Sequence, residues 1–129
     1  MWMTVDATYT DGVAGIAAVV WSRPLSEEGS TPLYVAGERV KAESIMDAEY
    51  KALLLAIQLA KSGDLYVQTD SKNIATSIAK LQEVAEWTSA HTINLHCDWA
   101  ARTNNSIADA FAAIAFRRGK FVAMLKGQP

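Results

Sequence analysis

Hydrophobic and polar residues alternate along the first part of the chain, a pattern that predicts β-strands. Residues 2–9 alternate, and after the turn sequence Asp11-Gly12 a second run of small and apolar residues covers 13–21. A polar loop bounded by prolines follows, and Leu33 to Val40 predicts a third strand. Three consecutive antiparallel strands would form a meander.

The apolar period then changes from that of a strand to that of a helix. Glu43 to Lys61 is rich in Ala, Leu and Ile, contains no Gly or Pro, and is followed by Ser62-Gly63, so it predicts a helix and its end. Leu65 to Thr69 predicts a fourth strand. Asp70-Ser71 could then cap a second helix that runs to about Leu81.

The last third of the chain predicts one more strand and one more helix. Ile93 to Trp99 alternates as a strand, and Thr103-Asn104-Asn105 caps a helix that runs to about Arg118 and stops at Gly119. The order βββαβαβα predicts an α/β fold, a five-stranded mixed sheet with helices on both faces. It would be a single domain over residues 1–129, with 119–129 as a C-terminal tail.

Length and composition fit one soluble domain and restrict its partners. The chain has 129 residues, a mass of 14.0 kDa, a formal net charge of −2 and a pI near 5.6, so no strong general attraction for nucleic acid is expected. The single Cys97 excludes an internal disulfide and a zinc-type cluster. Apolar runs are too short for a membrane span and no secretory signal is visible, so we expect a cytoplasmic monomer.

Four acidic residues stand among apolar or small neighbours, where a carboxylate is costly unless a positive group binds it. Asp6 interrupts a strand, although Asp is depleted in strands. Glu49 shares a helical face with apolar residues such as Leu53. Asp70 ends a strand and Asp109 opens the last helix. Asp70 could instead be a plain helix cap, and Asp109 could simply interact with the helix dipole.

A shared site for the four acids predicts a metal centre. Carboxylates within a few ångströms of one another cannot all ionise unpaired, because each raises the pKa of the others. Hard divalent cations such as Mg²⁺ accept several carboxylates while keeping waters and phosphate oxygens. Two such ions roughly 4 Å apart would activate a water and stabilise the leaving oxygen of a phosphodiester. Mn²⁺ is the expected substitute.

Nearly the whole chain resembles the ribonuclease H type 1 family, whose fold also has the order βββαβαβα. Each matching motif is weak alone, but their order and spacing make the set rather specific. The matching stretches are Val5-Asp6-Ala7-Thr8-Tyr9 with residues 15–20 after it, Ala48-Glu49-Tyr50-Lys51-Ala52-Leu53, Thr69-Asp70-Ser71-Lys72, and residues 102–112 from Arg102 to Ala112.

The resemblance implies cleavage of the RNA strand of RNA–DNA hybrids, leaving 5′-phosphate and 3′-hydroxyl ends. Asp6 would bridge both metal ions, and Asp109 would complete the site of the ion that activates water. Glu49 and Asp70 would hold the second ion, with Glu49 also near the ribose 2′-hydroxyl. The hybrid would be recognised by groove shape and 2′-hydroxyls rather than by base sequence.

The resemblance also marks three candidate substrate contacts and one further catalytic residue. Ser71, Lys72 and Asn105 fall in the matching motifs and are the candidate contacts. Arg102 resembles the Arg of a shorter subgroup that lacks the mobile catalytic His, and it could assist departure of the product phosphate. A surface Arg in a loop is the alternative interpretation.

The chain also departs from the family. Ile45 and Met46 stand where many relatives carry paired Asn residues that contact the hybrid, and the basic protrusion of longer relatives is absent. These losses predict weak hybrid binding in isolation. Two alternatives therefore stay open: a nuclease of the same fold for double-stranded RNA or branched DNA, and a non-catalytic module that interacts with nucleic acid or protein.

Overall fold

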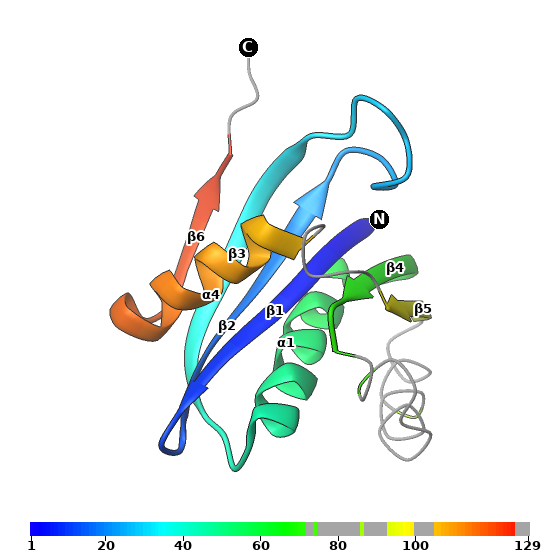
Figure 1. The fold of residues 1–129 in the computed structure, drawn as a ribbon. Helices are drawn as coiled ribbons and strands as arrows, with labels where there is room; N and C mark the ends of the chain where they lie inside the picture. The colour runs from blue at the N-terminus through cyan, green and yellow to red at the C-terminus, as the bar shows by residue number, and fades with distance from the viewer. Residues whose placement is uncertain (72–73, 75–85, 87–92, 100–104, 126–129) are drawn as a thin grey trace.

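In the part of the chain that the structure describes, helices α1 and α4 cover opposite faces of a mixed β-sheet (Figure 1). The computed structural model describes residues 1–71, 74, 86, 93–99 and 105–125. Within them, no helix is long and apolar enough to cross a membrane. The elements are β1 (Trp2–Thr10), β2 (Val13–Trp21), β3 (Pro32–Lys41), α1 (Ile45–Ala60), β4 (Gly63–Thr69), β5 (Ile93–Trp99), α4 (Ser106–Arg118) and β6 (Phe121–Met124).

The sheet has the strand order β5-β4-β1-β2-β3-β6. β1, β2 and β3 form the predicted antiparallel meander, whereas β4 pairs in parallel with both β1 and β5. The β1–β2 turn is Asp11-Gly12, and both residues have positive φ, of 47° and 82°, as a two-residue hairpin turn requires. The prediction of a mixed sheet is therefore confirmed.

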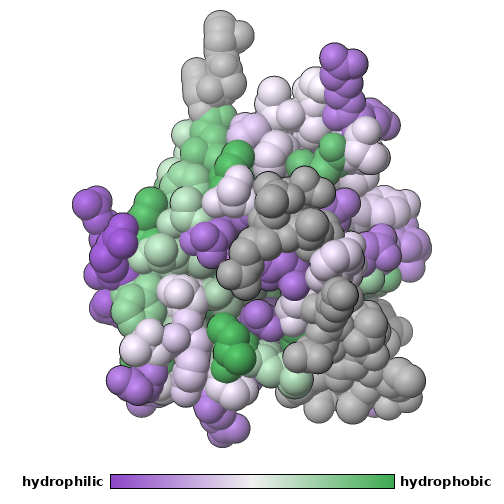
Figure 2. Space-filling model, in the orientation of Figure 1, coloured by the Kyte–Doolittle hydropathy of each residue, from purple (hydrophilic) through white to green (hydrophobic). Residues whose placement is uncertain are grey.

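The prediction of five strands was wrong, because β6 adds a sixth strand from the expected C-terminal tail. Its backbone pairs antiparallel with β3. Phe121, Ala123 and Leu125 alternate onto the face covered by α4, which gives this short segment a reason to extend. Val122 and Met124 point the other way and are 66% and 78% exposed. Figure 2 shows hydrophobic surface gathered over this edge strand.

Helix α1 covers one face of the sheet and builds the larger core. Ser44 caps its first turn by accepting a hydrogen bond from the Asp47 amide at 3.1 Å, and the Asp47 carboxylate accepts from the Glu43 amide at 2.9 Å. This reciprocal capping fixes where the helix begins. The core it covers contains Met3, Val5, Leu53, Ile57, Leu65 and Val67.

Helix α4 covers the opposite face and lies unusually close to it. A Cβ added at Gly15 of β2 would lie 2.2 Å from the Ala112 carbonyl oxygen, so only glycine admits the helix backbone there. Ala108 and Ala112 are fully buried against Ala17 and Val19. Small residues on both elements thus allow α4 to pack closely against β2.

The second predicted helix, to about Leu81, lies mostly outside the described residues. Its start is visible because Ile74 is helical, and the Ile74 amide donates to the Ser71 hydroxyl at 3.3 Å. That contact spans three residues, as a helix cap does. Ser71 therefore supplies the capping oxygen at the end of β4.

Candidate active site

Asp6 lies in the middle of β1 and is only 6% exposed. Because Met3, Val5 and Ala7 face the α1 core, Asp6 faces α4. One carboxylate oxygen of Asp6 accepts a hydrogen bond from the Ala7 amide at 2.9 Å. A buried acid on this side of the sheet must find its other partners among groups brought by neighbouring elements.

The parallel pairing of β4 with β1 brings Asp70 to Asp6. Val5 is in register with Thr69, and Asp70 directly follows Thr69 as the chain leaves β4. The Asp70 backbone carbonyl accepts a hydrogen bond from the indole N–H of Trp99 at 3.2 Å. β5, which ends at Trp99, therefore helps to hold the loop that carries Asp70.

Asp109 comes from the first turn of α4 and approaches from the solvent side. It is exposed, as expected for an acid at a helix N-terminus, where the dipole favours negative charge. Its carboxyl group is nevertheless hydrogen-bonded to that of Asp6. The site thus has a buried acid at its floor and an exposed acid at its rim.

The pKa of Asp6 shows the electrostatic consequence. The pKa is raised from the ordinary 3.8 to about 8, and burial is the largest cause. The Ala7 amide lowers the pKa, whereas the charge of Asp70 and the hydrogen bond and charge of Asp109 contribute to the rise. Acids packed in this way keep a proton between them, and a divalent cation could replace that proton. The chemistry of this donor set therefore fits a hard metal ion.

Asn105 joins the last helix to the strand that carries Asp6. It is 2% exposed, and its side-chain amide donates to the Val5 carbonyl at 2.8 Å. It stands at the N-cap position of α4 but makes no capping hydrogen bond there. Its carbonyl oxygen, also buried, has no hydrogen-bond partner among the described residues. In this arrangement Asn105 sets the position of the Asp109 turn against β1.

Asp70 and Asp109 both raise the pKa of Asp6, so the structure places these three predicted acids near one another. Glu49, the fourth, is half-buried on α1. Across the described residues, no three His, Cys, Asp or Glu side chains are close enough to hold a metal ion as they stand.

The other candidate residues are placed less fully. Ser71 is 7% exposed and its hydroxyl accepts from the Ile74 amide, so its described contact is a local one. Arg102 and Lys72 lie outside the described residues.

Sequence reasoning missed two contacts that hold the acids in place. One is the hydrogen bond from Asn105 to β1, and the other is the hydrogen bond from Trp99 to the Asp70 carbonyl. For the second contact, the available signal was a tryptophan at the end of the alternating run Ile93 to Trp99. Nothing in the local sequence distinguishes Asn105 from an ordinary N-cap.

Comparison with solved structures identifies the fold. RNase H1 from the halophilic archaeon Halobacterium salinarum superposes with a TM-score of 0.70 and 19% sequence identity, over 90% of this chain and 96% of that one. A foamy viral protease-reverse transcriptase, solved in complex with dsDNA, superposes with a TM-score of 0.56 and 16% sequence identity, over 89% of this chain and 91% of that one. No protein-family model and no curated protein matches the chain. The chain has the ribonuclease H-like fold.

Proposed function

We propose that this protein is a divalent-metal-dependent endonuclease of the ribonuclease H type 1 kind, acting on the RNA strand of RNA–DNA hybrids. The observation that carries the proposal is the group of three acids at Asp6, gathered from β1, β4 and α4 of a ribonuclease H-like fold. A buried carboxyl whose pKa is raised to about 8 is a poor structural element but a good metal ligand once its proton is lost.

In this proposal the acids would hold the metal, whose positive charge would let an anionic phosphodiester lie beside carboxylates. Asp6 at the floor, Asp70 and Asp109 at the sides and Glu49 from α1 would be the ligands. Mg²⁺, when bound, would supply a water of lowered pKa and neutralise charge on the leaving oxygen. The residues themselves would fix the angle of attack, since β1 and β4 are held in register and α4 is tied to β1 through Asn105.

Across the described residues no three acids are close enough to hold a metal ion as they stand, so the acids must draw together to share a metal site. The proposal therefore includes a small contraction on metal loading, because negative side chains that repel one another approach when a cation lies between them. The exposed rim residue Asp109 can move at little cost.

We also expect the isolated protein to bind the hybrid weakly. Ile45 and Met46 are 48% and 37% exposed at the start of α1, where the resembling family often carries Asn residues that contact the hybrid. Apolar side chains there offer no hydrogen bonds to sugar or base edges.

Cleavage of an end-labelled RNA–DNA hybrid in Mg²⁺ or Mn²⁺ tests the proposal. The parent protein should leave 3′-hydroxyl ends, whereas Asp6→Asn should lose at least about a hundredfold in rate, as is usual when a charge-stabilising group is removed. Asp11→Asn makes the same change in the exposed hairpin turn and should cleave like the parent.

Parallel substrates separate the alternatives. Faster cleavage of double-stranded RNA or branched DNA than of the hybrid would indicate a nuclease of the same fold whose substrate is that nucleic acid. An Asp6→Asn protein as active as the parent would refute the metal site. A folded parent with no cleavage, and no rise in melting temperature with either metal, would favour a non-catalytic interaction module.

A further inference from the structure

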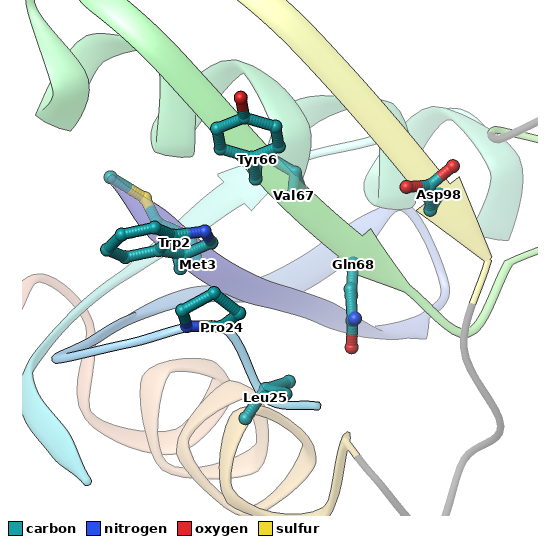
Figure 3. Close-up of a pocket in the computed structure, with 8 residues that line it drawn as sticks. All are labelled: Trp2, Met3, Pro24, Leu25, Tyr66, Val67, Gln68 and Asp98. Carbon is teal, nitrogen blue, oxygen red and sulfur yellow. The ribbon is translucent and has the colours of Figure 1, made fainter. Parts of the chain in front are cut away.

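A pocket opens on the same face of the sheet as the three acids, but further back along the strands. It encloses about 410 Å³, a volume suited to a small planar ligand. Figure 3 shows Trp2, Tyr66 and Pro24 on one side of it, Gln68 and Asp98 on the other, and Leu25 below.

The pocket and the candidate active site lie along the same two strands. Trp2 and Asp6 are four residues apart on β1, and Gln68 and Asp70 are two apart around the end of β4, so each pair shares one face of the sheet. At about 3.3 Å per residue, the pocket lies roughly 7–13 Å from the acids. Nucleotides in a strand are about 3.4 Å apart, so this is a separation of roughly two to four nucleotides.

Three aligned rings extend from the apolar side of the pocket. The Trp2 and Tyr66 ring centroids are 6.2 Å apart with 19° between planes, and those of Tyr66 and His96 are 4.5 Å apart with 11°. The rings come from β1, β4 and β5, and Tyr66 is 40% exposed. His96 covers one face of Tyr66, so the surfaces that remain for stacking are those of Trp2 and Tyr66 that line the pocket. Aromatic side chains on a sheet face bind unpaired bases by stacking, because every base has a π-face.

The described polar side of the pocket disfavours a phosphate. Among the described residues no Lys or Arg lines the pocket, and Asp98 would repel an anion. A second carboxylate, Asp64, lies nearby at 3.9 Å from His96. The Asp98 carboxylate instead suits hydrogen-bond donors, and the Gln68 amide can both donate and accept.

These features point to a neutral planar group that carries amino donors. Guanine presents adjacent ring N–H and amino donors that can meet both oxygens of one carboxylate, whereas uracil has no amino group. A base inside a duplex is already stacked on both sides and paired at its edge. Only an unpaired base can therefore enter the pocket.

We propose that this pocket binds an unpaired, amino-bearing base, guanine best, of a strand whose phosphodiester lies at the acids. The inference rests on the proposed function, because that function brings a nucleic-acid strand to this face. It assigns the enzyme a preference for hybrids that carry a single-stranded overhang or junction.

Binding in EDTA tests the pocket without requiring catalysis. Fluorescence anisotropy would compare a blunt RNA–DNA hybrid with the same hybrid carrying a short RNA overhang, either of uridines alone or with one guanosine among uridines. We expect the guanosine overhang to bind about tenfold more tightly than the blunt hybrid, the size of effect that stacking gives. The uridine overhang should fall between the two.

Variants then assign the preference to named side chains. Tyr66→Leu should bring the ratio of overhang to blunt affinity close to one, whereas Tyr66→Phe should keep it, because Phe retains the ring. Asp98→Asn should remove the choice of guanosine over uridine, since an amide offers one acceptor oxygen instead of two. Asp64→Asn makes the same charge change outside the pocket lining and should keep that choice.

Each result has a distinct meaning. Equal affinity for blunt and overhang hybrids, or an overhang preference that survives Tyr66→Leu, would overturn the proposal that the pocket binds a base. If the protein cleaves the hybrid but shows no overhang preference, the base-binding proposal fails and the nuclease proposal stands. An overhang bound through Tyr66 by a protein that cleaves nothing in Mg²⁺ or Mn²⁺ would refute the nuclease and support the pocket.

Discussion

At the scale of single residues, Asp6 carries an electrostatic cost that the rest of the fold does not offset. Its carboxyl group is buried beside two other acids, and one backbone amide is its described stabilising partner. The folded protein therefore holds a proton on Asp6 that the unfolded chain would release. Such a position is expected where binding, rather than stability, has shaped the residue.

This raised pKa predicts that metal-free protein loses stability as the pH rises. The pKa of Asp6 is about 8 when folded and 3.8 ordinarily, so its contribution is complete below pH 3.8 and is lost as the pH rises towards 8. Urea unfolding in EDTA at a series of pH values should show this fall in the parent but not in Asp6→Asn. Asp11→Asn is the matched control, and a parent whose stability relative to Asp6→Asn rises over this range would contradict the prediction.

At the scale of elements, the contact between α4 and β2 sets the position of Asp109. Gly15 lies under the helix backbone, with a virtual Cβ 2.2 Å from the Ala112 oxygen and 2.4 Å from the Phe116 nitrogen. At Gly37 the nearest atoms belong instead to the Phe121 ring, at 2.4 Å. The Phe121 ring at Gly37 can rotate away from an added methyl group, whereas the helix backbone at Gly15 cannot.

Gly15→Ala should therefore damage both stability and activity. We expect about 1–3 kcal/mol of destabilisation or more, as for overpacked cores, and a drop in hybrid cleavage because α4 carries Asp109 with it. Chemical denaturation and the cleavage assay measure the two effects. Gly37→Ala is the control and should cost less; a Gly15→Ala protein as stable as the parent would show that α4 adjusts freely.

Most elements were predictable because their signals are local. The β2 and β5 boundaries agree with the predicted ones, and the Ser62-Gly63 stop is close to the observed end of α1 at Ala60. β6 was missed because four residues have too little pattern of their own. They form a strand only because β3 leaves an edge to pair with and α4 leaves apolar surface beside it.

At the scale of the whole molecule, charge is arranged in a way that favours weak phosphate binding. The net charge is −2, and the exposed residues Arg117 and Arg118 lie in the last turn of α4, with Lys120 just beyond it. Asp109 is in the first turn of this helix, eight residues before Arg117, a separation of about 12 Å along the axis at 1.5 Å per residue.

Hybrid binding should accordingly depend little on salt. With few phosphates neutralised, we expect the slope of log affinity against log salt to stay below about 3 in magnitude. Anisotropy in EDTA over a salt series measures the slope, and Arg117→Gln should leave it unchanged. A slope near 6 that Arg117→Gln lowers by about one would instead place the basic cluster on the phosphates.

Periodicity and local composition were enough to locate the strands β1 to β5 and the helices α1 and α4, and to mark four acids as out of place. Which acids meet depends on the tertiary fold. Asp6 and Asp70 are neighbours through the parallel register of Val5 with Thr69, and Asp109 reaches them through the Gly15 contact and the Asn105 hydrogen bond. These are contacts between residues far apart in the chain, and local patterns do not encode them.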